Sequence, residues 1–335
     1  MHGSLLFARK IYYTILAVVG VSERIIHSNF GCFFPSLCNI VNSVAILILS
    51  RGKCGLSPCT TRYLVAMAMA DLLTIITEVI LHRITYFYFP LYFLRITPVC
   101  SAGYVLIRIA IDCSVWFTVT FTFDRFIAIC CQKLKLKYCT KKTAAVVLST
   151  TGIVFCLKNI PIYFRFKPIS IIDNVPIACS NKPSYFTDPR WIGFRMFEKA
   201  LSPLMPFGLI LLLNGLTVRH ILMASRVRQG LRGQSKGESQ CDPEMESRRK
   251  SMILLFSISG SFILLWFVYM LFFFEVEEYL DEDAAHLFEK VSYMLRNLSC
   301  CTNTFIYLAT QSKFREQLKR AMLYPVHSTI KRYIK

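Results

Sequence analysis

The stretch VCSAGYVLIRIAIDCSVWFTVTFTFDRFIAICC, residues 99–131, decides the fold. It is almost wholly apolar, and it exceeds the roughly 20 residues that a helix needs to cross the ~30 Å hydrocarbon core of a bilayer. Cys100 stands near its beginning and Asp124-Arg125 near its end. Because an α-helix rises about 1.5 Å per residue, Cys100 and Arg125 are separated by about 37 Å along its axis. The stretch therefore predicts a membrane-spanning helix with a cysteine at one face and a charged pair at the other.

The rest of the chain repeats this pattern. Of its 335 residues, 54% are hydrophobic and 18% are charged, whereas soluble domains carry about 25% charged residues. The sequence predicts an all-α membrane protein, a seven-transmembrane helix bundle within residues 30–310. Its predicted spans are Phe30–Ser50, Tyr63–His82, Val99–Cys131, Thr143–Phe164, Trp191–Leu222, Met252–Phe274 and His286–Thr310.

Two segments lie outside the predicted bundle. Residues 1–29 form an expected extracellular N-terminal segment that contains the apolar run Ile11–Val21. This run is too short to span a bilayer, and it is either an uncleaved segment lying at the outer surface or the core of a signal peptide. Residues 311–335 form an expected cytoplasmic tail. Within it, Lys313–Leu323 alternates basic and apolar residues, which predicts a short amphipathic helix on the inner leaflet.

The distribution of charge predicts the orientation of the chain. The loops assigned to the inside carry 23 of the 39 lysines and arginines, whereas the outer loop Glu275–Glu289 holds seven acids and neither lysine nor arginine. Because cytoplasmic loops keep an excess of Lys and Arg, we expect a multi-pass plasma-membrane protein with its N-terminus outside and its C-terminus inside. The net charge of +19 lies in these short inner segments, which argues for contact with anionic lipid and against a nucleic-acid partner. The inner segments are residues 51–62, 132–142, 219–250 and 311–335.

Several of the 14 cysteines can be assigned to one side of the membrane. Cys100 would face the oxidising exterior, where disulfides persist. Its best partner is Cys179, in the predicted outer loop between the fourth and fifth spans, and this bond would hold that loop over the outer end of the third helix. In the alternative interpretation, Cys100 and Cys179 are two of many thiols. The cysteines expected to stay reduced at the cytosolic side are Cys54, Cys59, Cys130, Cys131, Cys139 and Cys241.

Asp124 and Arg125 lie where the third span leaves the membrane, a depth at which charges are costly and therefore usually functional. Arg125 can pair with Asp124 in one state and with backbone carbonyls of a partner in another, because it stays charged and offers five donors. The alternative is an interfacial arginine that snorkels to water.

Asp71 lies in the middle of the second span, at a depth similar to that of Ser114 on the third and of Ser299 and Asn303 on the seventh. These hard oxygen ligands predict a small hydrated cation site, with sodium as its occupant. Alternatively, Asp71 is protonated and belongs to a purely structural hydrogen-bond network. No other cofactor is expected.

A set of residues distributed along the predicted spans, one group per span and in order, resembles the landmark residues of rhodopsin-like G-protein-coupled receptors. The resemblance covers nearly the whole chain. It is closest to an orphan-receptor group of that family over Cys59–Leu73, Asp112–Lys142 and Asp242–Tyr269. The residues that carry it are Asn42, Asp71, Cys100, Asp124-Arg125-Phe126, Pro206, Trp266, Asn303 and Tyr307.

The resemblance implies a ligand pocket open to the outside and a heterotrimeric G protein that docks at the inside. It implies that the sixth helix swings outward when an agonist binds and that Arg125 contacts the G protein. Trp266 would then be the switch at the pocket floor. Tyr307, one turn beyond Asn303, would rotate toward Arg125.

The sequence departs from the family pattern at several positions. Thr304 and Val268 stand where prolines are usual, so the kinks of the seventh and sixth helices lose their ordinary cause, the missing amide donor of proline. Asn214 replaces a tyrosine of the fifth helix. Arg248 stands where some receptors carry an acid that locks Arg125, so that inhibitory salt bridge is excluded.

Charges in the outer half of the predicted bundle mark a candidate ligand site. Arg108 and Asp112 lie one turn apart on the third span, and Glu198 on the fifth should face them. We expect Arg108 to bind a carboxylate and Asp112 or Glu198 to bind an amine, as an aromatic amino acid or a short peptide would require. Alternatively, the three charges neutralise one another, with Arg108 and Asp112 bridged at i, i+4. The expected wall consists of Tyr269, Met270, Phe273, Tyr293 and Asn297.

Other classes of protein fit less well. A seven-helix transporter or channel is the main alternative, but no internal repeat relates the two halves of the chain. A retinal-binding light receptor needs a lysine midway along the seventh span, where Arg296 is the basic residue. No Ser/His/Asp set, metal cluster or glycine-rich phosphate loop indicates an enzyme.

Overall fold

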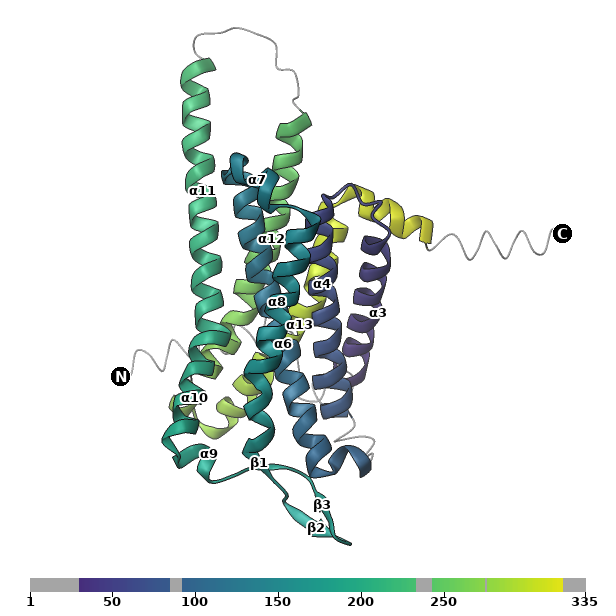
Figure 1. Cartoon of the computed structure of the whole chain (residues 1–335), viewed down its shortest axis with the longest axis vertical. Coiled ribbons are helices and arrows are strands. Elements are labelled where there is room, and N and C mark those ends of the chain that lie inside the picture. The colour runs from purple at the N-terminus through teal and green to yellow at the C-terminus, as the bar shows by residue number, and fades with distance from the viewer. Residues whose placement is uncertain (1–29, 85–91, 233–242, 275, 322–335) are drawn as a thin grey trace, which may run out of the picture.

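The predicted bundle is present (Figure 1). In a computed structural model, which describes residues 30–84, 92–232, 243–274 and 276–321, the chain is largely helical. The run Ile11–Val21, with both of its interpretations, lies outside the described residues. So do residues 233–242, between the fifth and sixth long helices, and the tail from residue 322 onward.

Seven long helical segments within the described ranges coincide with the seven predicted spans. The first three are α3 (Phe30–Ser50), α4 (Pro58–Thr74) with its π-helical continuation η1 (Ile75–Ile84), and α6 (Thr97–Cys130). The fourth and fifth are α8 (Lys141–Asn159) with the 3-10 helix η3 (Ile160–Arg165), and α10 (Pro189–Lys199) with the π-helix η4 (Ala200–Leu204) and α11 (Met205–Arg232). The last two are α12 (Pro243–Phe273) and α13 (Glu282–Thr310).

Local sequence explains where several of these helices begin. The first amides of a helix have no carbonyl partner within it, and a Ser, Thr or Asp side chain before the helix supplies one. Ser57 accepts a hydrogen bond from the amide of Thr60 at 3.1 Å before α4, and Thr140 does the same for Thr143 before α8. Asp188 accepts from the amide of Arg190 at 2.8 Å before α10. Each cap therefore fixes the start of a span.

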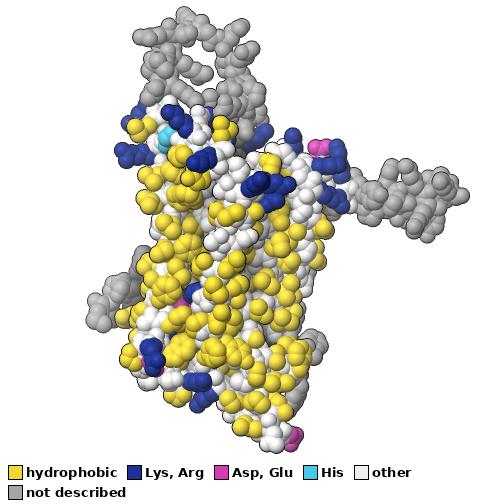
Figure 2. Space-filling view, viewed as in Figure 1, with side chains coloured by type: hydrophobic (Ala, Val, Ile, Leu, Met, Phe, Trp, Pro, Cys, Tyr) yellow, Lys and Arg dark blue, Asp and Glu magenta, His cyan; other side chains and the backbone are white. Residues whose placement is uncertain are grey.

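The surface is that of a multi-pass membrane protein. Five of the long segments, the second to the sixth, are long and apolar enough to cross a membrane by length and composition. The described side chains of the first form a shorter apolar helix, Ser36–Ser50, and polar residues such as Arg296 and Asn303 interrupt the seventh. Figure 2 shows apolar side chains along the flank of the bundle. Lysines and arginines gather at the end that carries α7 (Gln132–Tyr138), which we call the basic end.

The opposite end carries two short strand pairs and is called the strand end. β1 (Phe166–Lys167) pairs antiparallel with β4 (Ser180–Asn181), and β2 (Ser170–Ile172) with β3 (Val175–Ile177). The β2–β3 turn is Asp173-Asn174, with both residues at positive φ, which suits a two-residue hairpin because Asp and Asn tolerate this conformation. The remaining short elements are η2 (Tyr92–Arg95), α9 (Ser184–Thr187) and η5 (Val276–Tyr279).

A further helix, residues 312–321, turns away from the axis of α13 at the basic end (Figure 1). Phe314 is fully buried and its ring lies edge-on to Tyr307 with 5.9 Å between centroids, whereas Lys313 and Arg315 are exposed. The apolar side of this helix therefore rests on the bundle and the basic side is solvated, which confirms the amphipathic pattern within the described residues.

Candidate functional site

A disulfide bond between Cys100 and Cys179 holds the strand pairs against the third helix, as predicted. Two hydrogen bonds reinforce it: Thr97 Oγ1 donates to the carbonyl of Ala178 at 2.6 Å, and the amide of Ala178 donates to the carbonyl of Arg95 at 2.6 Å. The connection between α8 and α10 is thereby fixed beside the strand-end tip of α6.

The cysteines near the basic end are free thiols within the described residues, again as predicted. Burial and the neighbouring carboxylate of Asp124 raise the pKa of Cys139 to about 11, so this thiol is protonated at neutral pH and a poor nucleophile. Cys241 lies outside the described residues. The free thiols of this group are Cys54, Cys59, Cys130, Cys131 and Cys139.

A cavity of about 590 Å³ lies at the strand end between the third, fifth, sixth and seventh long helices. A volume of this size suits a small ligand. Five of the six predicted ligand-binding residues line it, namely Arg108, Glu198, Tyr269, Phe273 and Tyr293. The sequence did not nominate several further wall residues, among them Glu78, Tyr104, Arg165 and Arg296.

The sixth predicted residue, Asp112, is not among the residues that line this cavity. Its side chain is fully buried, and three groups donate to its carboxylate: Lys158 Nζ at 3.0 Å, Asn159 Nδ2 at 2.8 Å and Ser202 Oγ at 2.7 Å. With both oxygens occupied by donors of the protein, Asp112 stabilises the junction of the third, fourth and fifth helices. It is not placed to meet a ligand.

Lys158, on the fourth helix, is the centre of this junction. Its Nζ lies 3.0 Å from Asp112 and 2.9 Å from Glu198, and Glu198 also accepts from Arg108 at 3.3 Å. The expected alternative, an Arg108–Asp112 bridge along one helix, is replaced by pairs between helices. Two cations and two carboxylates make the cluster neutral, which offsets the cost of burying its charges.

A second buried ion pair, Arg296 with Glu78, joins the seventh helix to the second at the cavity wall. The guanidinium of Arg296 also lies over the rings of Tyr269 and Tyr293, at 4.5 and 4.9 Å from their centroids. The signal in the sequence was an arginine inside an apolar span, where an ionised residue needs a partner. The sequence could not identify that partner, which is 218 residues away.

Trp266 lies directly beneath the cavity wall. Its ring stacks on Phe262 at 5.2 Å and meets Tyr269 edge-on at 5.5 Å. Its Nε1 donates to Ser299 Oγ at 3.2 Å. Tyr269 therefore connects the indole to the cavity, and Ser299 connects it to the seventh helix.

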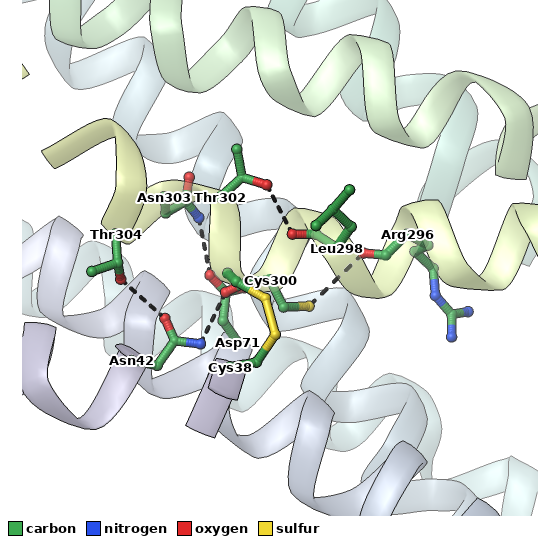
Figure 3. The surroundings of a disulfide bond; sticks show 10 residues. Cys38, Asn42, Asp71, Arg296, Leu298, Cys300, Thr302, Asn303 and Thr304 are labelled. Atoms are coloured by element: carbon green, nitrogen blue, oxygen red, sulfur yellow. Dashed lines mark hydrogen bonds between the residues drawn. A yellow bond between two sulfur atoms is a disulfide. The ribbon is translucent and has the colours of Figure 1, made fainter. Parts of the chain in front are cut away.

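The polar residues in the middle of the bundle form a hydrogen-bond network, part of which Figure 3 shows. Asp71 is buried, and one of its carboxylate oxygens accepts from Asn303 Nδ2 at 2.9 Å. The other accepts from Ser114 Oγ at 2.5 Å. Three of the four predicted cation ligands are thus together, whereas Ser299 is hydrogen-bonded to the indole of Trp266. Each oxygen of Asp71 keeps a lone pair beyond the bond described.

A disulfide bond that the sequence did not predict lies beside this network. Cys38 of α3 is bonded to Cys301 of α13, 263 residues away, and both side chains are buried (Figure 3). The same two helices are joined by Asn42, which donates to the carbonyl of Cys300 at 2.9 Å and accepts from Thr304 Oγ1 at 3.3 Å. Both cysteines lie inside predicted spans, where the side of the membrane gives no indication that a disulfide forms.

At the basic end Arg125 pairs with Asp124, in one of the two arrangements expected for it. Its Nη1 also donates to Ser251 Oγ on α12 at 3.3 Å, which links the third and sixth helices. Cys59 of α4 donates its thiol to Asp124 at 3.1 Å. Phe126, the third residue of the motif, is half-buried.

A second cavity, of about 460 Å³, opens at the basic end beside Arg125 and Ser251. Tyr307 is buried in a hydrophobic cluster that includes Tyr63, Phe121 and Phe314. Its hydroxyl has no hydrogen-bond partner among the described residues. A buried hydroxyl without a partner is costly, so this tyrosine would gain a hydrogen bond by moving.

Comparison with protein families gives a match over most of the chain. The model of the family described as 7 transmembrane receptor (rhodopsin family) matches residues 41–307. The match includes every element that contributes to the large cavity, the Asp71 network and the Arg125 pair.

Proposed function

Because the chain belongs to the rhodopsin family of seven-transmembrane receptors, we propose that it is a G-protein-coupled receptor of the plasma membrane with its N-terminus outside and its C-terminus in the cytoplasm. The strand end then faces the exterior, where the Cys100–Cys179 bond is stable. The basic end faces the cytoplasm, in agreement with the rule that inner loops carry Lys and Arg.

The ligand of this receptor is an extracellular small molecule, of the class of aromatic amino acids or short peptides. The cavity supports this assignment because it combines Arg108, which can bind a carboxylate, with the rings of Tyr269, Phe273 and Tyr293. Replacement of Arg108 by glutamine should lower agonist potency at matched surface expression. Unchanged potency would remove Arg108 from the ligand site.

Ligand binding is transmitted through Trp266 to the basic end, where a heterotrimeric G protein docks. The Arg125 pair with Asp124 and its bond to Ser251 represent the resting arrangement. In the active arrangement the sixth helix moves outward, Arg125 releases both partners and contacts the G protein, and Tyr307 rotates toward it. The orphan hydroxyl of Tyr307 favours that rotation.

Sodium acts as a modulator at the middle of the bundle. Asp71 and Ser114 supply oxygen atoms that would hold it. Asn303, whose Nδ2 donates to Asp71, would have to turn its amide to present its oxygen, and Ser299 would join them only after releasing Trp266. A bound cation would neutralise the buried Asp71 carboxylate and would tie the second, third and seventh helices together. This role favours the resting arrangement.

Reconstituted nucleotide exchange tests the receptor function. Full-length receptor in lipid nanodiscs is combined in turn with purified heterotrimers that stimulate adenylyl cyclase, inhibit it or activate phospholipase C. Aromatic amino acids and short aromatic peptides are the added ligands. We expect ligand-dependent exchange on at least one heterotrimer, lost in Arg125→Ala and kept in Arg190→Ala, an exposed arginine at the strand end. Ion current through receptor-containing membranes, with no exchange on any heterotrimer, would instead establish the transporter or channel alternative.

A further inference from the structure

The carboxylates near the ligand cavity are already held by cations of the protein. Glu198 accepts from Lys158 at 2.9 Å and from Arg108 at 3.3 Å, and Glu78 pairs with Arg296. A ligand amine would have to displace one of these partners and leave a buried lysine or arginine unpaired, which is strongly unfavourable. These carboxylates are therefore poor binding partners for the amine of a ligand.

Two other acids complete the inventory of carboxylates around the described wall. Asp112 is fully buried below the cavity and is occupied by Lys158, Asn159 and Ser202. Glu289 lines the cavity and is half-buried. Of the two acids that the sequence nominated for an amine, Asp112 is out of reach and Glu198 is doubly paired.

Basic groups, by contrast, exceed acids on the described wall. Arg165 donates Nη1 to the hydroxyl of Tyr185 at 3.2 Å, and its buried Nε has no hydrogen-bond partner among the described residues. Because that Nε is buried, Arg165 contributes to the cavity through its positive charge, and its guanidinium lies over the rings of Phe166 and Tyr185 at 4.5 and 5.0 Å from their centroids. The acids of the described wall are Glu78, Glu198 and Glu289, and the cations are Arg108, Arg165, Arg195, Lys199 and Arg296.

The remainder of the described wall is mostly aromatic, with Ile107 and Ile111 as its aliphatic members. The ring of Tyr269 lies 5.8 Å from that of Tyr293 and 6.1 Å from that of Phe273, and Phe272 lies 5.4 Å from Tyr293. Rings at these separations form a continuous apolar surface on which a further ring can stack.

Resting on the receptor function above, we propose that this cavity selects an aromatic carboxylate by its anionic group, and that Lys158 is the residue that sets the preference for an acid over an amine. While Lys158 is present, its cluster with Arg108, Asp112 and Glu198 is neutral and the cations elsewhere on the wall dominate. Without Lys158, two carboxylates face Arg108 alone, and the floor of the cavity becomes negative.

The test uses two probes that share a phenyl ring and a two-carbon chain, 3-phenylpropionate and 2-phenylethylamine. Their dissociation constants are measured from the concentration dependence of thermal stabilisation of full-length receptor in nanodiscs, with no G protein present. We expect wild type to bind the acid more tightly than the amine. In Lys158→Met the acid-to-amine preference should shift toward the amine by at least about tenfold, because one unit of charge is removed near the ligand.

Two further variants separate the effect of charge from damage to the fold. Lys158→Arg keeps the charge and should keep the wild-type preference. Lys158→Met combined with Asp112→Asn restores a neutral cluster and should also prefer the acid, so the proposal remains testable if Lys158→Met alone does not fold. The proposal would be overturned if wild type bound the amine as tightly as the acid or more tightly. This includes the case in which Glu289 holds the amine, so that Glu289→Gln abolishes amine binding. Acid binding without nucleotide exchange would leave the proposal standing and count against the receptor function instead.

Discussion

Replacement of Cys301 by serine should destabilise the receptor through the loss of its bond to Cys38. The bond joins α3 to α13 and closes a loop whose ends are 263 residues apart in sequence. Chain-entropy arguments assign about 5.6 kcal/mol to a loop of that length at 25 °C. Because lipid-embedded helices already restrict the unfolded chain, we expect the free energy of unfolding to fall by about 2–4 kcal/mol, the usual range for a disulfide.

The pattern among variants is more diagnostic than the size of the loss. Either Cys38→Ser or Cys301→Ser breaks the same bond, so the double variant should unfold at the same temperature as each single variant. Cys300→Ser is the matched control, because Cys300 is the adjacent buried cysteine and is a free thiol. Its replacement should cost less than about 1 kcal/mol, the scale of a small change at a buried site. Unfolding is followed by scanning calorimetry of receptor in micelles.

Fragment analysis gives an independent measurement of the same bond. A protease site placed among residues 233–242 separates Cys38, Cys100 and Cys179 from Cys301, so of the two disulfides of the described residues only Cys38–Cys301 joins the two fragments. After free thiols are alkylated, the fragments should migrate together without reductant and apart with it. Separation without reductant in wild type, or additive destabilisation by the two serine substitutions, would refute the bond.

Three other perturbations follow from the contacts above. Glu78→Met should lower the free energy of unfolding by about 3–5 kcal/mol because it leaves Arg296 buried without its partner. Adding Arg296→Met in the same chain should recover most of that stability. A double variant as unstable as the single variant would show that the pair is unimportant. Ser251→Ala removes the bond from Arg125 and should raise basal nucleotide exchange about fivefold, the effect of about 1 kcal/mol on a two-state equilibrium; a basal rate equal to that of wild type would contradict this. Sodium chloride should raise the unfolding temperature of wild type relative to choline chloride at equal ionic strength and should have no such effect on Asp71→Asn, whereas an equal effect on both would place the ion elsewhere.

The spans and the Cys100–Cys179 disulfide were predictable because their causes are local. A helix that crosses lipid must be long and apolar whatever surrounds it, and counting the spans places Cys100 and Cys179 at the same end of the bundle. The five cavity residues were predictable for a related reason, since a charge or a cluster of rings in the outer half of a span must face the interior of the bundle.

Partner choice was not predictable, because it depends on how helices are rotated against one another. Arg108 and Asp112 are neighbours on one helix, yet each pairs with a residue of another helix. Lys158 determines this pairing because it contacts both Asp112 and Glu198. The sequence could not indicate this, because near the end of an apolar span a lysine that snorkels to water and a lysine that points into the bundle look the same. The Arg296–Glu78 pair was not predicted for the same reason, because its members lie on different helices.

In the seventh helix Thr304 replaces the usual proline, and this changes how α13 is held against α3. A proline at position 304 would leave the carbonyl of residue 300 without its helical amide, but Thr304 keeps that amide and α13 continues unbroken to Thr310. Its hydroxyl instead donates to Asn42, which in turn donates to the carbonyl of Cys300. With the Cys38–Cys301 bond one turn away, α3 and the middle of α13 are joined by a covalent bond and two hydrogen bonds. Any displacement of Tyr307 must therefore arise in the turns beyond Thr304 or carry α3 with it.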